Sequence, residues 1–159
     1  MKPTINLSFF APRIGPTLIY SYPEAILDED LSYMIGAMMN LVFTEDSFTI
    51  SYEDISLLNH NFEINSSWNH GGKESLMLTF VFQRISLDIE RKIIDLFKNF
   101  QNKLDSEQNI FTGLYINYIE RREGEDKKNI VKYNSLIKLY IKELYLSILE
   151  NVEIKKKKK

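Results

Sequence analysis

The chain has 159 residues, a net charge of −2 and 26% charged side chains, and 44% of its residues are hydrophobic. These values predict one domain with a core large enough to need no disulfide or metal. The absence of cysteine excludes thiolate metal sites and a cysteine nucleophile. No apolar run approaches the roughly 20 residues of a membrane-spanning helix, and no basic face typical of nucleic-acid binders is present.

The first predicted element is a pair of strands joined by a tight turn, within residues 5–24. Apolar and polar residues alternate on both sides of the Pro/Gly-rich segment 11–16. In the second strand, Leu18, Tyr20 and Tyr22 are expected to share one face. A helix from about residue 28 to residue 43 follows. Acidic residues stand at its start, where a helix favours negative charge, and apolar residues recur at helical spacing.

Three strands are predicted next, over residues 48–52, 55–66 and 75–83. The last is almost continuously apolar, which indicates a central strand buried on both faces. The loop at residues 66–74 contains two glycines before Lys73 but lacks the spacing of a phosphate-binding P-loop, so a flexible hairpin loop is favoured.

Helices are predicted over residues 86–104, with Ser86 as N-cap, and over about 129–150. Residues 111–119 fit both helical and strand spacing, and helix is favoured. The order of elements predicts an α/β layered domain over residues 1–154, with a five-stranded, mainly antiparallel sheet. One helix is expected on one face and two or three on the other, and the lysines at 155–159 are expected to form a disordered tail.

The outer face of the first helix is a candidate partner-binding surface. Between residues 31 and 44 the sequence contains no charged residue, and such a face is usually covered by something. Another part of the chain and a partner protein remain equal alternatives from the sequence. The candidate residues are Tyr33, Gly36, Ala37, Asn40 and Phe43.

No residue pattern predicts catalysis. His60 and His70 are the only histidines, and they lack the spacing of a metal site. His60 is expected to be exposed or capped by a neighbour, and His70 to lie in a loop. We therefore expect no catalytic residue, no bound metal and no cofactor.

The segment FFAPRIGPTLIYSYPE resembles the opening of the nitrogen permease regulator-like proteins. In that family a strand ending in two Phe leads through a Pro/Gly turn to a Thr/Ile-Tyr strand that closes on Pro-Glu. Gly15-Pro16 matches the family by standing directly before the second strand, and SLMLTFVF is similar to its central strand. The order β-β-α-β-β-β-α-α is also that of the longin domain, whereas the roadblock fold starts with a helix. The resemblance covers about residues 4–104.

The resemblance implies a longin dimer that regulates a small GTPase. The family forms a longin heterodimer in a complex that accelerates GTP hydrolysis on Rag-type GTPases, with a catalytic arginine in the loop before the central strand. Lys73 occupies that place here, and Arg13 does not. Because lysine lacks the bidentate guanidinium of an arginine finger, we expect a non-enzymatic scaffold. Its expected partners are a Ras-like GTPase and a second copy or another longin or roadblock protein, with Lys73 as a candidate GTPase-facing residue.

Three alternatives remain. The protein could be a membrane-trafficking longin of the adaptor or tether type, whose basic tail at 155–159 contacts anionic membranes. It could be a GTPase-activating subunit that uses Lys73. It could also be a small-molecule-sensing module, although no pocket is readable from the sequence. The expected location is cytoplasmic, with peripheral membrane contact under the trafficking alternative, and no nucleic acid is expected as a partner.

Overall fold

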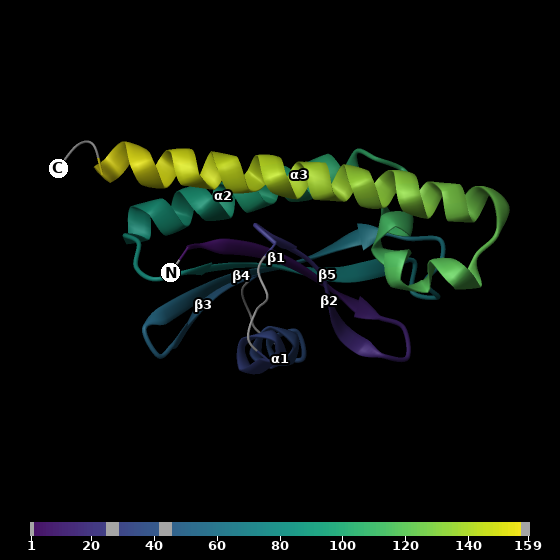
Figure 1. Ribbon diagram of the computed structural model, residues 1–159, viewed down its shortest axis with the longest axis horizontal. Coiled ribbons are helices and arrows are strands. Elements are labelled where there is room, and N and C mark those ends of the chain that lie inside the picture. The colour runs from purple at the N-terminus through teal and green to yellow at the C-terminus, as the bar shows by residue number, and fades with distance from the viewer. Residues whose placement is uncertain (1, 25–28, 42–45, 157–159) are drawn as a thin grey trace.

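A five-stranded sheet forms the middle layer of the protein, with one helix on one face and three helical segments on the other (Figure 1). The computed structural model describes residues 2–24, 29–41 and 46–156, with side chains described as far as residue 152. The elements in chain order are β1 (Thr4–Ala11), β2 (Gly15–Tyr22), α1 (Glu29–Met38), β3 (Ser47–Tyr52), β4 (Ile55–Asn65), β5 (Lys73–Phe82), α2 (Leu87–Asp105), the 3₁₀ helix η1 (Ile110–Arg121) and α3 (Gly124–Lys156). The predicted layered α/β architecture is confirmed at this level.

The strand β5 lies at the centre of the sheet, as its hydrophobicity predicts. The strand order is β2-β1-β5-β4-β3, and each neighbouring pair is antiparallel. One face of β5 packs under α2, η1 and α3 through Leu76, Leu78 and Phe80. Its other face packs under α1 through Met77 and Val81. Both faces of the strand are therefore covered.

The pairing of β1 with β2 contains an irregularity that the sequence pattern did not predict. Leu7 pairs with Tyr20, whereas the next residue, Ser8, pairs with Leu18, so Ile19 is an extra residue in β2. A bulge of this kind reverses the faces on which the following side chains lie. Tyr20 therefore packs at the edge of the core under α3. Leu18 pairs with Ser8, whose side chain lies on the α1 side of the sheet. The prediction that Leu18, Tyr20 and Tyr22 share one face is therefore wrong.

The helix α1 is held by a small apolar contact. It buries Leu31, Ile35 and Met38 against the sheet. The sheet below it also carries a row of buried or half-buried polar side chains that runs across four strands and is hydrogen-bonded within itself: Ser21 donates to Asn6, Asn6 to the carbonyl of Thr79, and Thr79 to Asn59. Residues 28, 42 and 43 of the expected helix lie outside the described residues, and the described helix ends at Met38.

The predicted C-terminal helices are present, with changed boundaries. Ser86 caps α2, because its side chain accepts a hydrogen bond from the amide of Ile89. Residues 110–121 form a 3₁₀ helix with non-helical backbone at Tyr115 and Tyr118, which is why the sequence spacing there was ambiguous. The last helix begins at Gly124 instead of about 129.

The far end of α3 also differs from the prediction. The helix runs to Lys156, so the first two lysines of the expected disordered tail continue the helix, and residues 157–159 lie outside the described residues. Two acidic residues in its first turn favour the early start at Gly124, since negative charge stabilises a helix N-terminus. Residues 122 and 123 alone connect η1 to α3.

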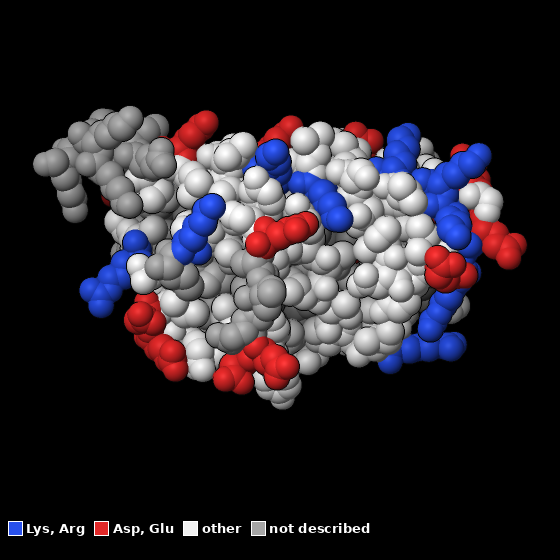
Figure 2. Space-filling model, viewed as in Figure 1, with Lys and Arg blue, Asp and Glu red and all other residues white. Residues whose placement is uncertain are grey.

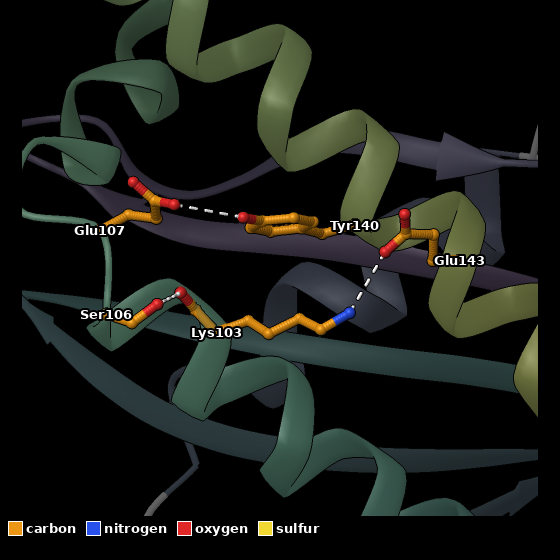
Figure 3. A network of polar contacts seen from close by, with 5 residues as sticks. All are labelled: Lys103, Ser106, Glu107, Tyr140 and Glu143. Atoms are coloured by element: carbon orange, nitrogen blue, oxygen red, sulfur yellow. Dashed lines mark hydrogen bonds and ion pairs between the residues drawn. The ribbon is translucent and has the colours of Figure 1, made fainter.

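Polar contacts join the end of α2 to the middle of α3 (Figure 3). Lys103 Nζ lies 3.2 Å from Glu143 Oε2, and the same ammonium lies 5.3 Å from the centre of the Tyr140 ring. The Tyr140 hydroxyl donates to Glu107 Oε1 over 3.3 Å. These groups are exposed or half-buried, so they orient the two helices more than they stabilise them.

The backbones of η1 and α3 lie close together at Gly113 in η1. A Cβ atom added there would lie 2.5 Å from the backbone N of Asn134 and 2.6 Å from the carbonyl C of Tyr133, both in α3. The Asn134 side-chain amide also donates to the Gly113 carbonyl over 3.1 Å. Only glycine therefore lets η1 lie against α3 in this way.

Replacing Gly113 with alanine is expected to lower the free energy of unfolding by about 1–3 kcal/mol, because the methyl group meets backbone atoms that cannot move aside. Chemical denaturation, followed by the midpoint at unchanged slope, measures this loss. Gly36→Ala is the matched control: its nearest new contact is 3.8 Å, and alanine favours helix by about 0.5–1 kcal/mol, so it should stabilise the protein. Equal effects of the two variants would contradict the packing at Gly113.

Candidate functional site

The outer face of α1 is open to solvent over the described residues. Tyr33 is 81% exposed, Ala37 and Asn40 are also exposed, and Gly36 is half-buried beside Pro16. Phe43, the fifth candidate, lies outside the described residues. Because α2 and α3 pack on the opposite face of the sheet, the C-terminal helix does not cover this surface (Figure 1).

The surface continues from the end of α1 into a hollow over the sheet. Leu41, which is 51% exposed, and Met39 form one side of this hollow, whose volume is about 680 Å³. Phe10, 43% exposed, lies on its other side with Lys73 nearby. Lys73 and two residues just after α1, Met39 and Leu41, therefore line the same hollow. The sequence analysis had treated Lys73 and the helix face as separate sites. The described lining residues are Phe10, Met39, Leu41, Asp46, Asn61, Phe62, Glu63, Lys73, Ser75, Leu76 and Gln101.

Lys73 is the first residue of β5 and does not lie in the preceding loop. It pairs with Asn65 in the sheet, and its Nζ lies 3.5 Å from Glu63 Oε2. Both side chains are more than half exposed, and an ion pair of that kind contributes at most about 1 kcal/mol. Its charge can therefore reorient toward a partner at small cost.

The next residue, Glu74, is a completely buried carboxylate that the sequence analysis missed. Its oxygens accept hydrogen bonds from Ser66 Oγ at 2.9 Å, from Asn69 Nδ2 at 3.3 Å and from the Tyr115 hydroxyl. Burial, followed by the bond to Glu74, raises the pKa of Tyr115, so this tyrosine stays protonated and donates. The alternation of side chains along β5 could have indicated that Glu74 is buried, because Glu74 lies on the same face of the strand as Leu76 and Leu78.

This buried carboxylate fixes the loop between β4 and β5 in one shape. The amide of Trp68 donates to Ser66 Oγ, and the amide of Gly71 donates to Asn69 Oδ1. The amide of Ser66 bonds to the carbonyl of Gly72. The predicted hairpin connection is confirmed, whereas the predicted flexibility is opposed by these hydrogen bonds within the loop. The loop contacts η1 where Trp68 packs edge-on to Tyr115 and where the Tyr115 hydroxyl donates to Glu74.

Three arginines from distant parts of the sequence meet at the same end of the molecule. Arg13 comes from the turn between β1 and β2, and Arg121 and Arg122 come from the end of η1. Together with Pro12, Tyr115 and Tyr118 they line a cavity of about 290 Å³. Figure 2 shows Lys and Arg side chains gathered, with carboxylates among them, at the end that holds η1 and the first turns of α3. The sequence analysis set Arg13 aside and singled out neither Arg121 nor Arg122.

The two histidines do not form a chemical site. His60 is 2% exposed, and its Nδ1 and Nε2 atoms lie 2.8 Å from Ser47 Oγ and 3.1 Å from Gln101 Oε1. It is capped, as one expected alternative stated, and it is not exposed. His70 is exposed in the β4–β5 loop. Among the residues that the structure describes, no three His, Asp or Glu side chains are placed to hold a metal ion.

Comparisons with known proteins identify no relative of this chain: neither the scan against protein-family models nor the search of curated proteins finds a match. In the described part of the chain, no helix has both the length and the apolar character needed to cross a membrane.

The burial of His60 predicts a pH dependence of stability. Desolvation lowers its pKa below the ordinary value of 6.5, even though the bond to Gln101 acts in the other direction. Below about pH 6.5 the unfolded chain therefore binds a proton that the folded protein does not, and the free energy of unfolding falls as the pH decreases. Above that pH the residue contributes no slope.

Denaturation measured between pH 8 and pH 5 tests this dependence. The variant His60→Gln should lose part of the decrease in stability on acidification. The variant His70→Gln removes the exposed histidine and should keep the wild-type slope. Equal slopes for all three proteins would show that His60 does not remain neutral in the folded state.

Proposed function

We propose that this protein is a non-enzymatic scaffold of the longin type that binds a protein partner through α1 and regulates a Ras-like small GTPase. The carrying observation is that the sequence has no charged residue from position 31 to position 44, while Tyr33 on the outer face of α1 and Leu41, just after the helix, are exposed to solvent. Exposed apolar and aromatic residues that lie together mark interaction surfaces more often than isolated ones do.

The partner expected on this surface is a second longin-type subunit, either another copy or a related chain. The opening hairpin and the element order support this assignment, since both agree with the longin resemblance. The hollow beside α1 supports it as well, because its mainly polar lining also presents Phe10, Met39 and Leu41 next to the helix, a mixture typical of protein interfaces. A GTPase would then bind the assembled pair, with Lys73 at the edge of the hollow as a contact.

Introducing a charge at Tyr33 tests the proposal. Tyr33→Asp should weaken association with the partner subunit by about 2 kcal/mol or more, because a buried aromatic anchor is replaced by a carboxylate. Size-exclusion chromatography with light scattering measures dimer formation, and a binding assay with Ras-like GTPases measures the second contact. Leu87→Asp is the matched control, since Leu87 is 71% exposed at the start of α2 on the opposite face.

A wild-type protein that is strictly monomeric and binds none of the GTPases offered would contradict the proposal. Equal loss of binding in Tyr33→Asp and Leu87→Asp would also contradict it, because the effect would then not depend on α1.

The GTPase-activating alternative depends on Lys73 and makes a different prediction. A residue that stabilises the transferred phosphate should, when replaced by alanine, lower stimulated GTP hydrolysis and leave binding intact. The scaffold proposal expects Lys73→Ala to leave the hydrolysis rate unchanged. Glu63→Ala is the control, because it frees the ammonium of Lys73 from its ion pair without removing it. A hydrolysis rate that falls in Lys73→Ala and is kept in Glu63→Ala would establish the enzymatic alternative.

A further inference from the structure

The cavity beside η1 has an unusual charge. Its lining residues are Pro12, Arg13, Tyr115, Tyr118, Arg121 and Arg122, so every charged lining residue is a cation. Over the described residues, none of the three guanidinium groups forms an ion pair with a carboxylate. Three positive charges that converge without a carboxylate partner repel one another, and an anion in the cavity would relieve that repulsion.

Two nearby carboxylates have other partners. Glu120, which precedes the two arginines, lies 3.8 Å from the ammonium of Lys127. Glu74 lies beyond the lining residues, where three neutral donors occupy its oxygens. Its own charge is therefore dispersed over hydrogen bonds, and it does not neutralise the arginines by direct contact.

Aromatic rings hold two of the guanidinium groups in place. Arg122 Cζ lies 3.9 Å from the centre of the Trp68 ring and 5.9 Å from that of Tyr115. Arg121 Cζ lies 5.5 Å from the centre of the Tyr118 ring. A guanidinium that packs on a ring uses its face, so its N–H groups remain free to donate at the edge. The donors are thus pre-positioned, which lowers the entropy lost on binding.

The third arginine is held by the backbone of the β1–β2 turn. Arg13 has a φ of 67°, a left-handed conformation that L-residues adopt at a cost of about 1–2 kcal/mol. The turn is closed by a hydrogen bond from the amide of Ile14 to the carbonyl of Ala11 at 3.2 Å. Backbone strain of this kind is found preferentially at binding sites.

The size and walls of the cavity restrict the ligand. A volume of about 290 Å³ is close to the lower end of the range for small-molecule sites. It corresponds to about ten water molecules at ~30 Å³ each, enough for one ring and one anionic group. Two tyrosine rings and the Pro12 ring supply flat apolar walls, which favour a flat ligand body.

We propose that this cavity binds a small anion with a flat ring, an aromatic phosphate or carboxylate, through the guanidinium groups of Arg13, Arg121 and Arg122. The arginines bind the anionic oxygens by charge-assisted, bidentate hydrogen bonds, and Tyr115 and Tyr118 contact the ring. This assigns a ligand-sensing site to the protein. It does not rest on the proposed function, since the cavity lies on the η1 side of the sheet and the partner surface lies on the α1 side.

The only tryptophan of the chain reports on the site directly, because Trp68 lies under Arg122. The full chain is titrated at constant ionic strength with phenyl phosphate, benzoate, inorganic phosphate and phenol, and Trp68 fluorescence is followed. The expected result is saturable binding of phenyl phosphate, benzoate or both, with weaker binding of inorganic phosphate and none of phenol. The two aryl anions distinguish a phosphate from a carboxylate ligand.

Charge-removing variants then locate the site. Arg13→Gln and Arg121→Gln should each weaken binding about tenfold or more, the loss expected for one charge-assisted hydrogen bond. Arg13→Lys, which keeps the charge but loses the fork, should fall between Arg13→Gln and wild type. Arg91→Gln, an exposed arginine of α2 that does not line the cavity, is the control for net charge and should bind as wild type.

Circular dichroism of each variant establishes that it is folded, and Arg13 is suited to this test because it is exposed at a turn. The absence of saturable binding of both aryl anions by the wild type would overturn the proposal. Equal weakening in Arg91→Gln and Arg13→Gln would overturn it too, because binding would then follow net charge. Inorganic phosphate that binds as tightly as phenyl phosphate would remove the ring from the assigned ligand.

Discussion

The unequal burial of the two faces of the central sheet determines most of this structure. β5 must be covered on both sides, because seven consecutive residues from Leu76 to Phe82 are buried. The chain supplies three helical segments to one face and a single short helix to the other (Figure 1). The larger core joins α2, η1 and α3 to β1, β4 and β5, whereas the smaller one has six buried residues among those that the structure describes. Stability therefore comes mainly from one side.

The face of the sheet under α1 is covered by a single short helix, and this side of the molecule carries the candidate partner surface. Its buried polar row, from Ser21 to Asn59, contributes hydrogen bonds in place of apolar area. The hydroxyl of Ser8, also a buried sheet residue, has no hydrogen-bond partner among the described residues. A helix that covers such a face buries little apolar area against its own domain, and its outer side chains remain exposed to solvent. Tyr33 and Leu41 are exposed on this side of the sheet, and Leu87, Val131, Leu139 and Leu146 are exposed on α2 and α3.

The clustering of arginines at one end of the molecule follows from the antiparallel topology of the sheet. The β1–β2 turn and the β4–β5 loop emerge at the same end of the sheet, since β1 and β5 are antiparallel neighbours. The 3₁₀ helix η1 crosses that end on its way from α2 to α3, and Gly113 allows it to lie close to the α3 backbone. Arg13, Trp68 and Arg122 are brought together by this crossing.

Much of the fold was predictable from the sequence, but the arrangement of the β1–β2 turn, the β4–β5 loop and η1 was not. Strand alternation and helical spacing are local signals, so the five strands, α1, and the cap of α2 at Ser86 could be read directly. The bulge at Ile19 could not, because Leu18, Ile19 and Tyr20 are all apolar or aromatic, so only the pairing with β1 reveals which of them is the extra residue. The close approach of η1 to α3 at Gly113 is a tertiary contact that no local sequence spacing indicates. Glu74 could have been found by extending the alternation of β5 by one step.

The β1–β2 hairpin is the physical connection between the two surfaces. Phe10 lines the hollow beside α1. The cationic cavity is lined by Pro12 and Arg13, which follow in the turn after β1. Ala11, completely buried between them, anchors the hairpin to the larger core. Binding at one surface changes affinity at the other only if both sites favour different positions of a shared element. The β1–β2 hairpin is the element that contributes to both surfaces, and within it the core contact of Ala11 and the left-handed backbone of Arg13 follow Phe10 in the chain.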